Sequence, residues 1–96
     1  MSKKRYQEIK NEIGKLLKEM REESGYSSPF AVAKELDLSY TSVYKTELGV
    51  SLPSKHKIYL LCLVYKATDE ERYKIDTLIQ EALEIRRSGI KVNEKE

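Results

Sequence analysis

Two signals for the start of a helix lie only eleven residues apart, and this spacing limits most strongly how the chain can fold. At the first signal Ser28 can cap a helix, and Pro29 can occupy its first turn without losing a needed hydrogen bond. At the second, Ser39 precedes another short run that favours a helix. The sequence therefore predicts helices over about 29–36 and 40–48, separated by a tight turn.

Three further helices are predicted from apolar side chains that repeat at helical spacing. The first runs from about Lys4 to Glu23 and has the apolar positions Ile9, Ile13, Leu16, Leu17 and Met20. Another begins after Ser54, with an apolar side of Ile58, Leu61, Cys62 and Tyr65. The last covers about 69–87 after a capping box of Thr68 and Glu71. With no strand predicted, the chain is expected to be all-α, with one domain over 1–90 and a polar tail over 91–96.

Composition and charge narrow the classes of function. The first 66 residues carry 12 basic and 8 acidic side chains, whereas residues 67–96 carry 6 basic and 8 acidic ones. This mild asymmetry permits phosphate binding by the front part of the chain. No signal peptide or membrane span is predicted, and the single Cys62 lies in an apolar run, so a cytoplasmic protein is expected.

Catalysis is not predicted. Cys62 and His56 are six residues apart, which places them on different faces of a helix, and no phosphate-binding glycine loop is present. His56 has no second His or Cys near it in sequence, as a metal site would require. We therefore expect a non-enzymatic protein that needs no metal, cofactor or small-molecule substrate.

The two short central helices have the geometry that presents one helix to a DNA major groove. Counted from Pro29, Ala33 is fifth, Asp37 ninth and Val43 fifteenth, with Val32, Leu36 and Leu38 between them. In this pattern the segment resembles the helix-turn-helix of the phage Cro and repressor (XRE-type) family, and the resemblance covers about 13–66. It departs at Asp37, where that family usually has glycine, and at Thr46, where it has an apolar residue.

The resemblance implies a five-helix, lambda-repressor-like DNA-binding domain with an added C-terminal helix. It further implies a structural ion pair between Arg21 and Glu47. The expected function is a sequence-specific transcriptional regulator, a repressor that binds a palindromic operator in double-stranded DNA as a homodimer.

Candidate DNA contacts follow from the faces of the predicted helices. Base contacts are predicted for the exposed side of the second central helix: Tyr40, Thr41, Tyr44 and Lys45. Phosphate contacts are predicted at helix starts and nearby lysines: Ser28, Ser39, Ser42, Lys55 and Lys57.

Two alternatives stay open at this point. No Arg, Asn or Gln lies among the candidate base contacts, so a protein-interaction module that uses Tyr40, Tyr44 and the last helix is a second hypothesis. The wide apolar face of the last helix, about 69–87, fits either a homodimer formed through this helix and the one before it, or a helix that folds back to complete the core of one chain.

Overall fold

The computed structural model describes residues 3–89, which contain five helices. They are α1 (Lys3–Glu23), α2 (Pro29–Leu36), α3 (Tyr40–Glu47), α4 (Lys55–Tyr65) and α5 (Asp69–Arg87). Within this range no strand occurs, which confirms the all-α prediction. The predicted polar tail over 91–96 lies outside the described residues.

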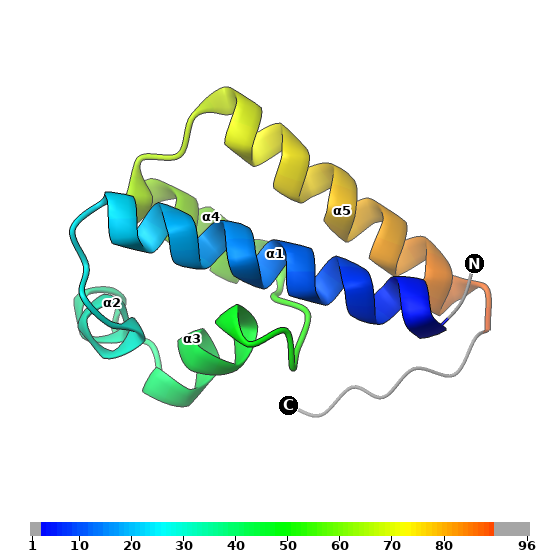
Figure 1. Ribbon diagram of the computed structural model, residues 1–96, viewed down its shortest axis with the longest axis horizontal. Coiled ribbons are helices and arrows are strands. Elements are labelled where there is room, and N and C mark those ends of the chain that lie inside the picture. The colour runs from blue at the N-terminus through cyan, green and yellow to red at the C-terminus, as the bar shows by residue number, and fades with distance from the viewer. Residues whose placement is uncertain (1–2, 90–96) are drawn as a thin grey trace.

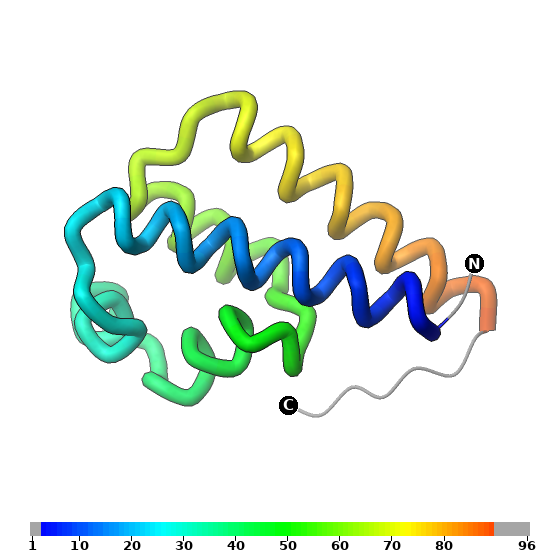
Figure 2. The backbone as a smooth tube through the Cα atoms, viewed as in Figure 1, coloured from blue at the N-terminus to red at the C-terminus, as the bar shows by residue number. Residues whose placement is uncertain are grey.

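The long helix α1 is the centre of the fold (Figure 1). It has α5 along one side, the α2–α3 pair along the other, and α4 behind it (Figures 1 and 2). Helix α1 contacts α3, α4 and α5, and α2 contacts α3. The orientation of the α2–α3 pair therefore depends mainly on its contacts with α1.

The apolar stripes of α1, α4 and α5 form one core. Their most buried members include Ile9, Ile13, Leu17, Leu61, Ile75 and Ile85. Cys62 belongs to this core, where it packs as a small apolar side chain. Burial raises the pKa of its thiol, which therefore stays protonated. None of the described helices has the length and apolar character needed to cross a membrane.

Helix α5 buries its apolar face within the same chain. Ile75, Leu78, Ile79, Ala82 and Ile85 are all buried, and α5 packs against α1. Of the two interpretations left open by the sequence, the structure favours the helix that completes the core of one chain. A dimer interface is not required to cover this face.

Each of the two central helices begins at the serine predicted to cap it. Ser28 Oγ accepts a hydrogen bond from the Ala31 amide at 3.2 Å, and Ser39 Oγ accepts one from the Ser42 amide at 3.0 Å. Between them, Asp37 ends α2 in the left-handed region, with φ 55°. The Leu38 amide then donates to the Ala33 carbonyl at 2.8 Å, which closes the helix end.

Replacing Asp37 with glycine should stabilise the protein. A residue with a Cβ is strained in the left-handed region, and glycine removes that strain at a position where the side chain is exposed. We expect Asp37→Gly to raise the free energy of unfolding by about 1 kcal/mol, measured by thermal or urea unfolding. The control Glu35→Gly, inside α2, should lower it by a similar amount. Destabilisation by Asp37→Gly would contradict this account of the turn.

Candidate nucleic-acid interface

Helix α3 passes close to α1 at a glycine, Gly14. A Cβ built on Gly14 would lie 2.5 Å from the Glu47 carbonyl oxygen and 2.7 Å from that of Thr46. Any side chain at this position would therefore overlap the backbone of the last turn of α3. Gly14 was not predicted to be a contact residue, because its place in the apolar stripe of α1 resembles that of any small helical residue.

The ion pair implied by the family resemblance is present and buried. Arg21 Nε lies 2.7 Å from Glu47 Oε2, and a second guanidinium nitrogen lies 3.2 Å from Glu47 Oε1. The two side chains are only 5% and 7% exposed, and the hydrogen bonds to Glu47 raise the pKa of Arg21. Arg21 also donates to the Tyr26 carbonyl at 2.9 Å. The pair thus ties α1 to the end of α3 and to the segment before α2.

A second part of α1 contacts the loop that follows α3. Gln7 Nε2 donates to the Gly49 carbonyl at 2.9 Å, and the buried Lys10 Nζ donates to the Val50 carbonyl at 3.2 Å. Gly49 has φ 76°, and a Cβ there would collide with Asn11. None of these contacts was predicted, because hydrogen bonds to loop carbonyls leave no pattern in the sequence. Together with Gly14 and Arg21, they fix the C-terminal end of α3 and the loop after it against α1.

The outer side of α3 presents two neighbouring surfaces, one polar and one apolar. The polar surface is a shallow hollow of about 280 Å³, lined by Ser39, Thr41, Ser42, Lys45, Ser51 and Lys57. Its lining holds hydroxyl groups and two lysines but no carboxylate. Such a surface is complementary to an anion, and we call it the basic hollow. It brings together predicted base contacts and predicted phosphate contacts.

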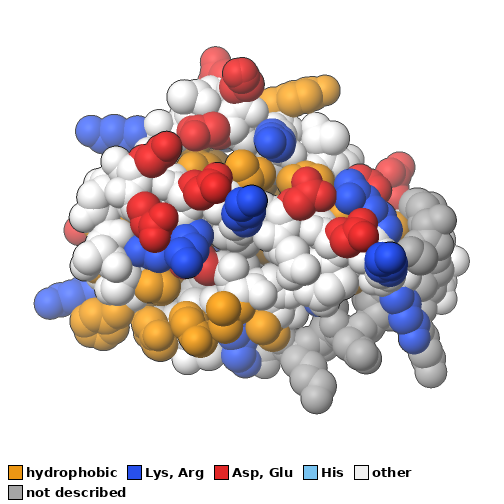
Figure 3. Space-filling view, in the orientation of Figure 1, with side chains coloured by type: hydrophobic (Ala, Val, Ile, Leu, Met, Phe, Trp, Pro, Cys, Tyr) orange, Lys and Arg blue, Asp and Glu red, His pale blue; other side chains and the backbone are white. Residues whose placement is uncertain are grey.

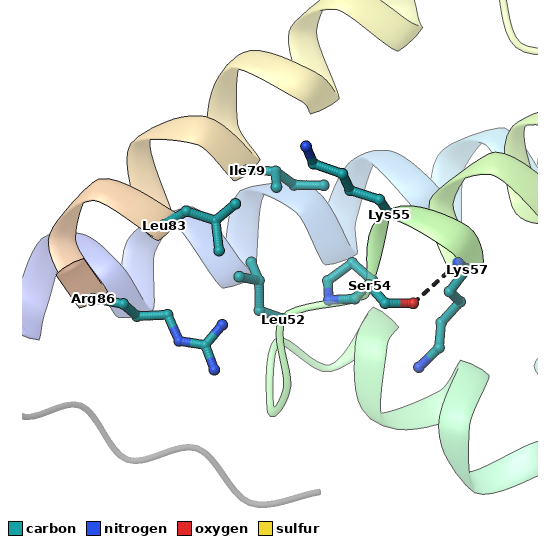
Figure 4. A pocket seen from close by; sticks show the side chains of 8 residues that line it. Leu52, Ser54, Lys55, Lys57, Ile79, Leu83 and Arg86 are labelled. Carbon is teal, nitrogen blue, oxygen red and sulfur yellow. Dashed lines mark hydrogen bonds between the residues drawn. The ribbon is translucent and has the colours of Figure 1, made fainter.

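Of the two lysines predicted to contact phosphate at the start of α4, only Lys57 lines the basic hollow. Because they are two residues apart on a helix, their side chains diverge. Lys57 extends toward α3 and the basic hollow, whereas Lys55 extends toward α5 beside Ile79 (Figure 4). Both lysines line a cavity of about 570 Å³ between α5 and the loop before α4, but only Lys57 also lines the basic hollow. The structure therefore places Lys57, and not Lys55, next to the candidate base contacts.

The second outer surface of α3 is apolar. Hydrophobic side chains gather along the lower left edge of the molecule, over α2 and α3 (Figure 3). We call the exposed group Phe30, Tyr40, Tyr44 and Leu48 the aromatic row. The Phe30 and Tyr40 ring centroids are 6.3 Å apart, and the Tyr40 and Tyr44 rings stack at 5.4 Å. Tyr40 and Tyr44 were predicted to be exposed on this face, but Phe30 was not singled out.

Three polar side chains of α2 and α3 have roles in the local structure. Ser28 and Ser39 use their oxygens as helix caps, which leaves each hydroxyl proton to donate. Thr46, the unexpected polar residue, is buried and its hydroxyl donates to the Ser42 carbonyl at 2.9 Å. Its hydroxyl is therefore satisfied within α3, and threonine is tolerated at an otherwise apolar position.

The fold and this surface define a DNA-binding helix-turn-helix domain. Comparison with known families agrees, since the model of the family described as "Helix-turn-helix domain" matches residues 12–74. The chain belongs to this helix-turn-helix family. No curated protein and no solved structure matches the chain. The narrower Cro and repressor type stays a prediction.

Proposed function

We propose that the protein is a sequence-specific transcriptional regulator in the cytoplasm, a repressor rather than an enzyme. The proposal rests on how α3 is placed: its outer side is exposed, while α1 holds the end of the helix through Gly14 and the buried Arg21–Glu47 pair. Beside it lies the basic hollow, with hydroxyls and lysines but no carboxylate. A rigid helix next to cationic and hydroxyl groups suits insertion into a major groove between phosphate chains.

The repressor would bind a palindromic operator as a homodimer. Two copies related by a two-fold axis would present their α3 helices about one DNA turn apart, roughly 34 Å. Tyr59 and Leu63 lie one turn apart on α4 and are 51% and 56% exposed, so this face offers apolar area to a second copy. Binding over a promoter would block transcription by occlusion.

Selection from random duplex DNA at near-physiological salt tests the proposal. The wild-type protein should enrich a palindromic sequence, and the triple variant Tyr40→Ala, Thr41→Ala, Lys45→Ala should lose the enrichment. The control Tyr73→Ala, Lys74→Ala, Thr77→Ala removes the same three residue types from the exposed side of α5 and should keep it. Failure of the folded wild-type protein to enrich any sequence would overturn the proposal.

A second candidate is a protein-interaction module on the same scaffold, and the aromatic row is the observation that favours it. Exposed, adjoining apolar side chains are common where one protein binds another. The dependence of binding on salt concentration distinguishes the two functions. Binding through several phosphates must weaken steeply as salt rises, whereas a mostly apolar protein contact should change little.

A further inference from the structure

We propose that the aromatic row recognises the 5-methyl groups of thymines in the major groove of the operator. This inference rests on the proposed function and adds which chemical group on the bases the protein selects. The four side chains of the aromatic row are well exposed: Phe30 by 60%, Tyr40 by 44%, Tyr44 by 42% and Leu48 by 55%. Tyr40 and Tyr44 lie on α3, Leu48 is the C-cap of that helix, and Phe30 lies in the first turn of α2.

The three rings of the row pack on one another. Tyr40 and Tyr44 stack with an angle of 16° between their rings, and the Phe30 ring packs against Tyr40 at 58°. Rings that support one another in this way lose little side-chain freedom when they enter a groove. The result is a continuous apolar strip from the first turn of α2 along the exposed side of α3.

Among the four bases, only thymine presents an apolar group in the major groove. The other groups that the bases present in the major groove are hydrogen-bond donors and acceptors. Arginine and amide side chains contact these polar groups most selectively. The exposed side of α3 has none of these side chains, and Lys45 is its one cationic residue. The chemistry of this surface is therefore matched to methyl groups more than to polar base edges.

Charge around the row favours a duplex as the occupant. The basic hollow adjoins the row on the same helix, with Lys45 and Lys57 placed to contact phosphates. Tyr40 and Tyr44 are about 6 Å apart along the axis of α3, and base pairs stack at about 3.4 Å. Side chains at this spacing would match methyl groups about two base-pair steps apart. We therefore expect operators with thymines about two base pairs apart in each half-site.

The test replaces thymine by uracil, which removes only the methyl group. In the duplex enriched by selection, uracil at the thymines of the conserved half-sites should weaken binding about four-fold per methyl group lost. The same number of uracils in the flanking sequence should have no effect. Phe30→Ala with Tyr44→Ala removes half of the row and should clearly reduce the discrimination, whereas Tyr73→Ala should preserve it.

The outcomes separate this inference from the proposed function. Equal affinity for the thymine and uracil half-sites would overturn recognition of methyl groups and leave the regulator proposal standing. Discrimination that is undiminished in the Phe30→Ala, Tyr44→Ala variant would also overturn it, because the row would then contribute nothing to it. If the folded protein enriches no duplex at all, both proposals fail.

Discussion

Replacing Gly14 with alanine will lower the free energy of unfolding by about 2 kcal/mol, although alanine is the better helix former. The added Cβ would overlap the carbonyl oxygens of Thr46 and Glu47, which belong to the backbone of α3 and cannot rotate away. The overlap outweighs a gain of about 1 kcal/mol from helix propensity. Urea unfolding measures the loss, and a melting temperature lower by roughly 8–16 °C should accompany it.

Binding and stability need to be compared for this variant. Lys15→Ala changes the adjacent, exposed position of α1 and should alter stability by less than about 0.5 kcal/mol. Below its melting temperature, Gly14→Ala should bind the selected duplex more weakly than Lys15→Ala does, because α3 is pushed away from α1. A Gly14→Ala variant more stable than the wild type would show that α3 does not depend on this contact.

Removing Arg21 is expected to have the largest effect on stability. Arg21→Ala leaves the Glu47 carboxylate buried without its partner, which costs about 3–5 kcal/mol in comparable buried pairs. A variant with this loss will be partly or wholly unfolded at 37 °C if the protein has ordinary stability. Far-ultraviolet circular dichroism during urea unfolding gives the measurement.

Two further variants, each compared with Arg21→Ala, test whether the unpaired buried charge causes the loss of stability. The double variant Arg21→Met, Glu47→Leu removes both charges and should be clearly more stable than Arg21→Ala alone. Arg5→Ala breaks a more exposed network, with Glu81 at 2.7 Å and Glu12 at 3.1 Å, and should have a much smaller effect. If Arg5→Ala and Arg21→Ala proved equally harmful, burial of the Arg21–Glu47 pair would not explain the loss.

The sequence predicted the helices well because their ends are marked by local chemistry. Ser28, Ser39, Ser54 and Thr68 all accept hydrogen bonds from amides in the first turns they cap. Such caps involve residues three positions apart, so they can be recognised without knowing the fold. The Arg21–Glu47 pair joins residues 26 positions apart and was predicted only through the family resemblance.

Contacts between distant elements were harder to predict. The approach of Gly14 to the backbone of α3 and the hydrogen bond from Lys10 to the Val50 carbonyl depend on how the helices cross. The same holds for Phe30, which joins Tyr40 only because of the angle between α2 and α3. Lys55 and Lys57 were grouped by sequence distance, whereas two positions along a helix turn side chains apart.

The central place of α1 has a consequence for how the protein is made. Its apolar stripe is synthesised before the other four described helices and α5, which covers one side of it, after them; Arg5 pairs with Glu81, 76 residues later. Until α5 has been synthesised and has left the ribosome, the chain has α1 but lacks the helix that completes the core. Final folding of this domain should follow the release of α5 rather than proceed helix by helix, and chains truncated before α5 should aggregate or be degraded.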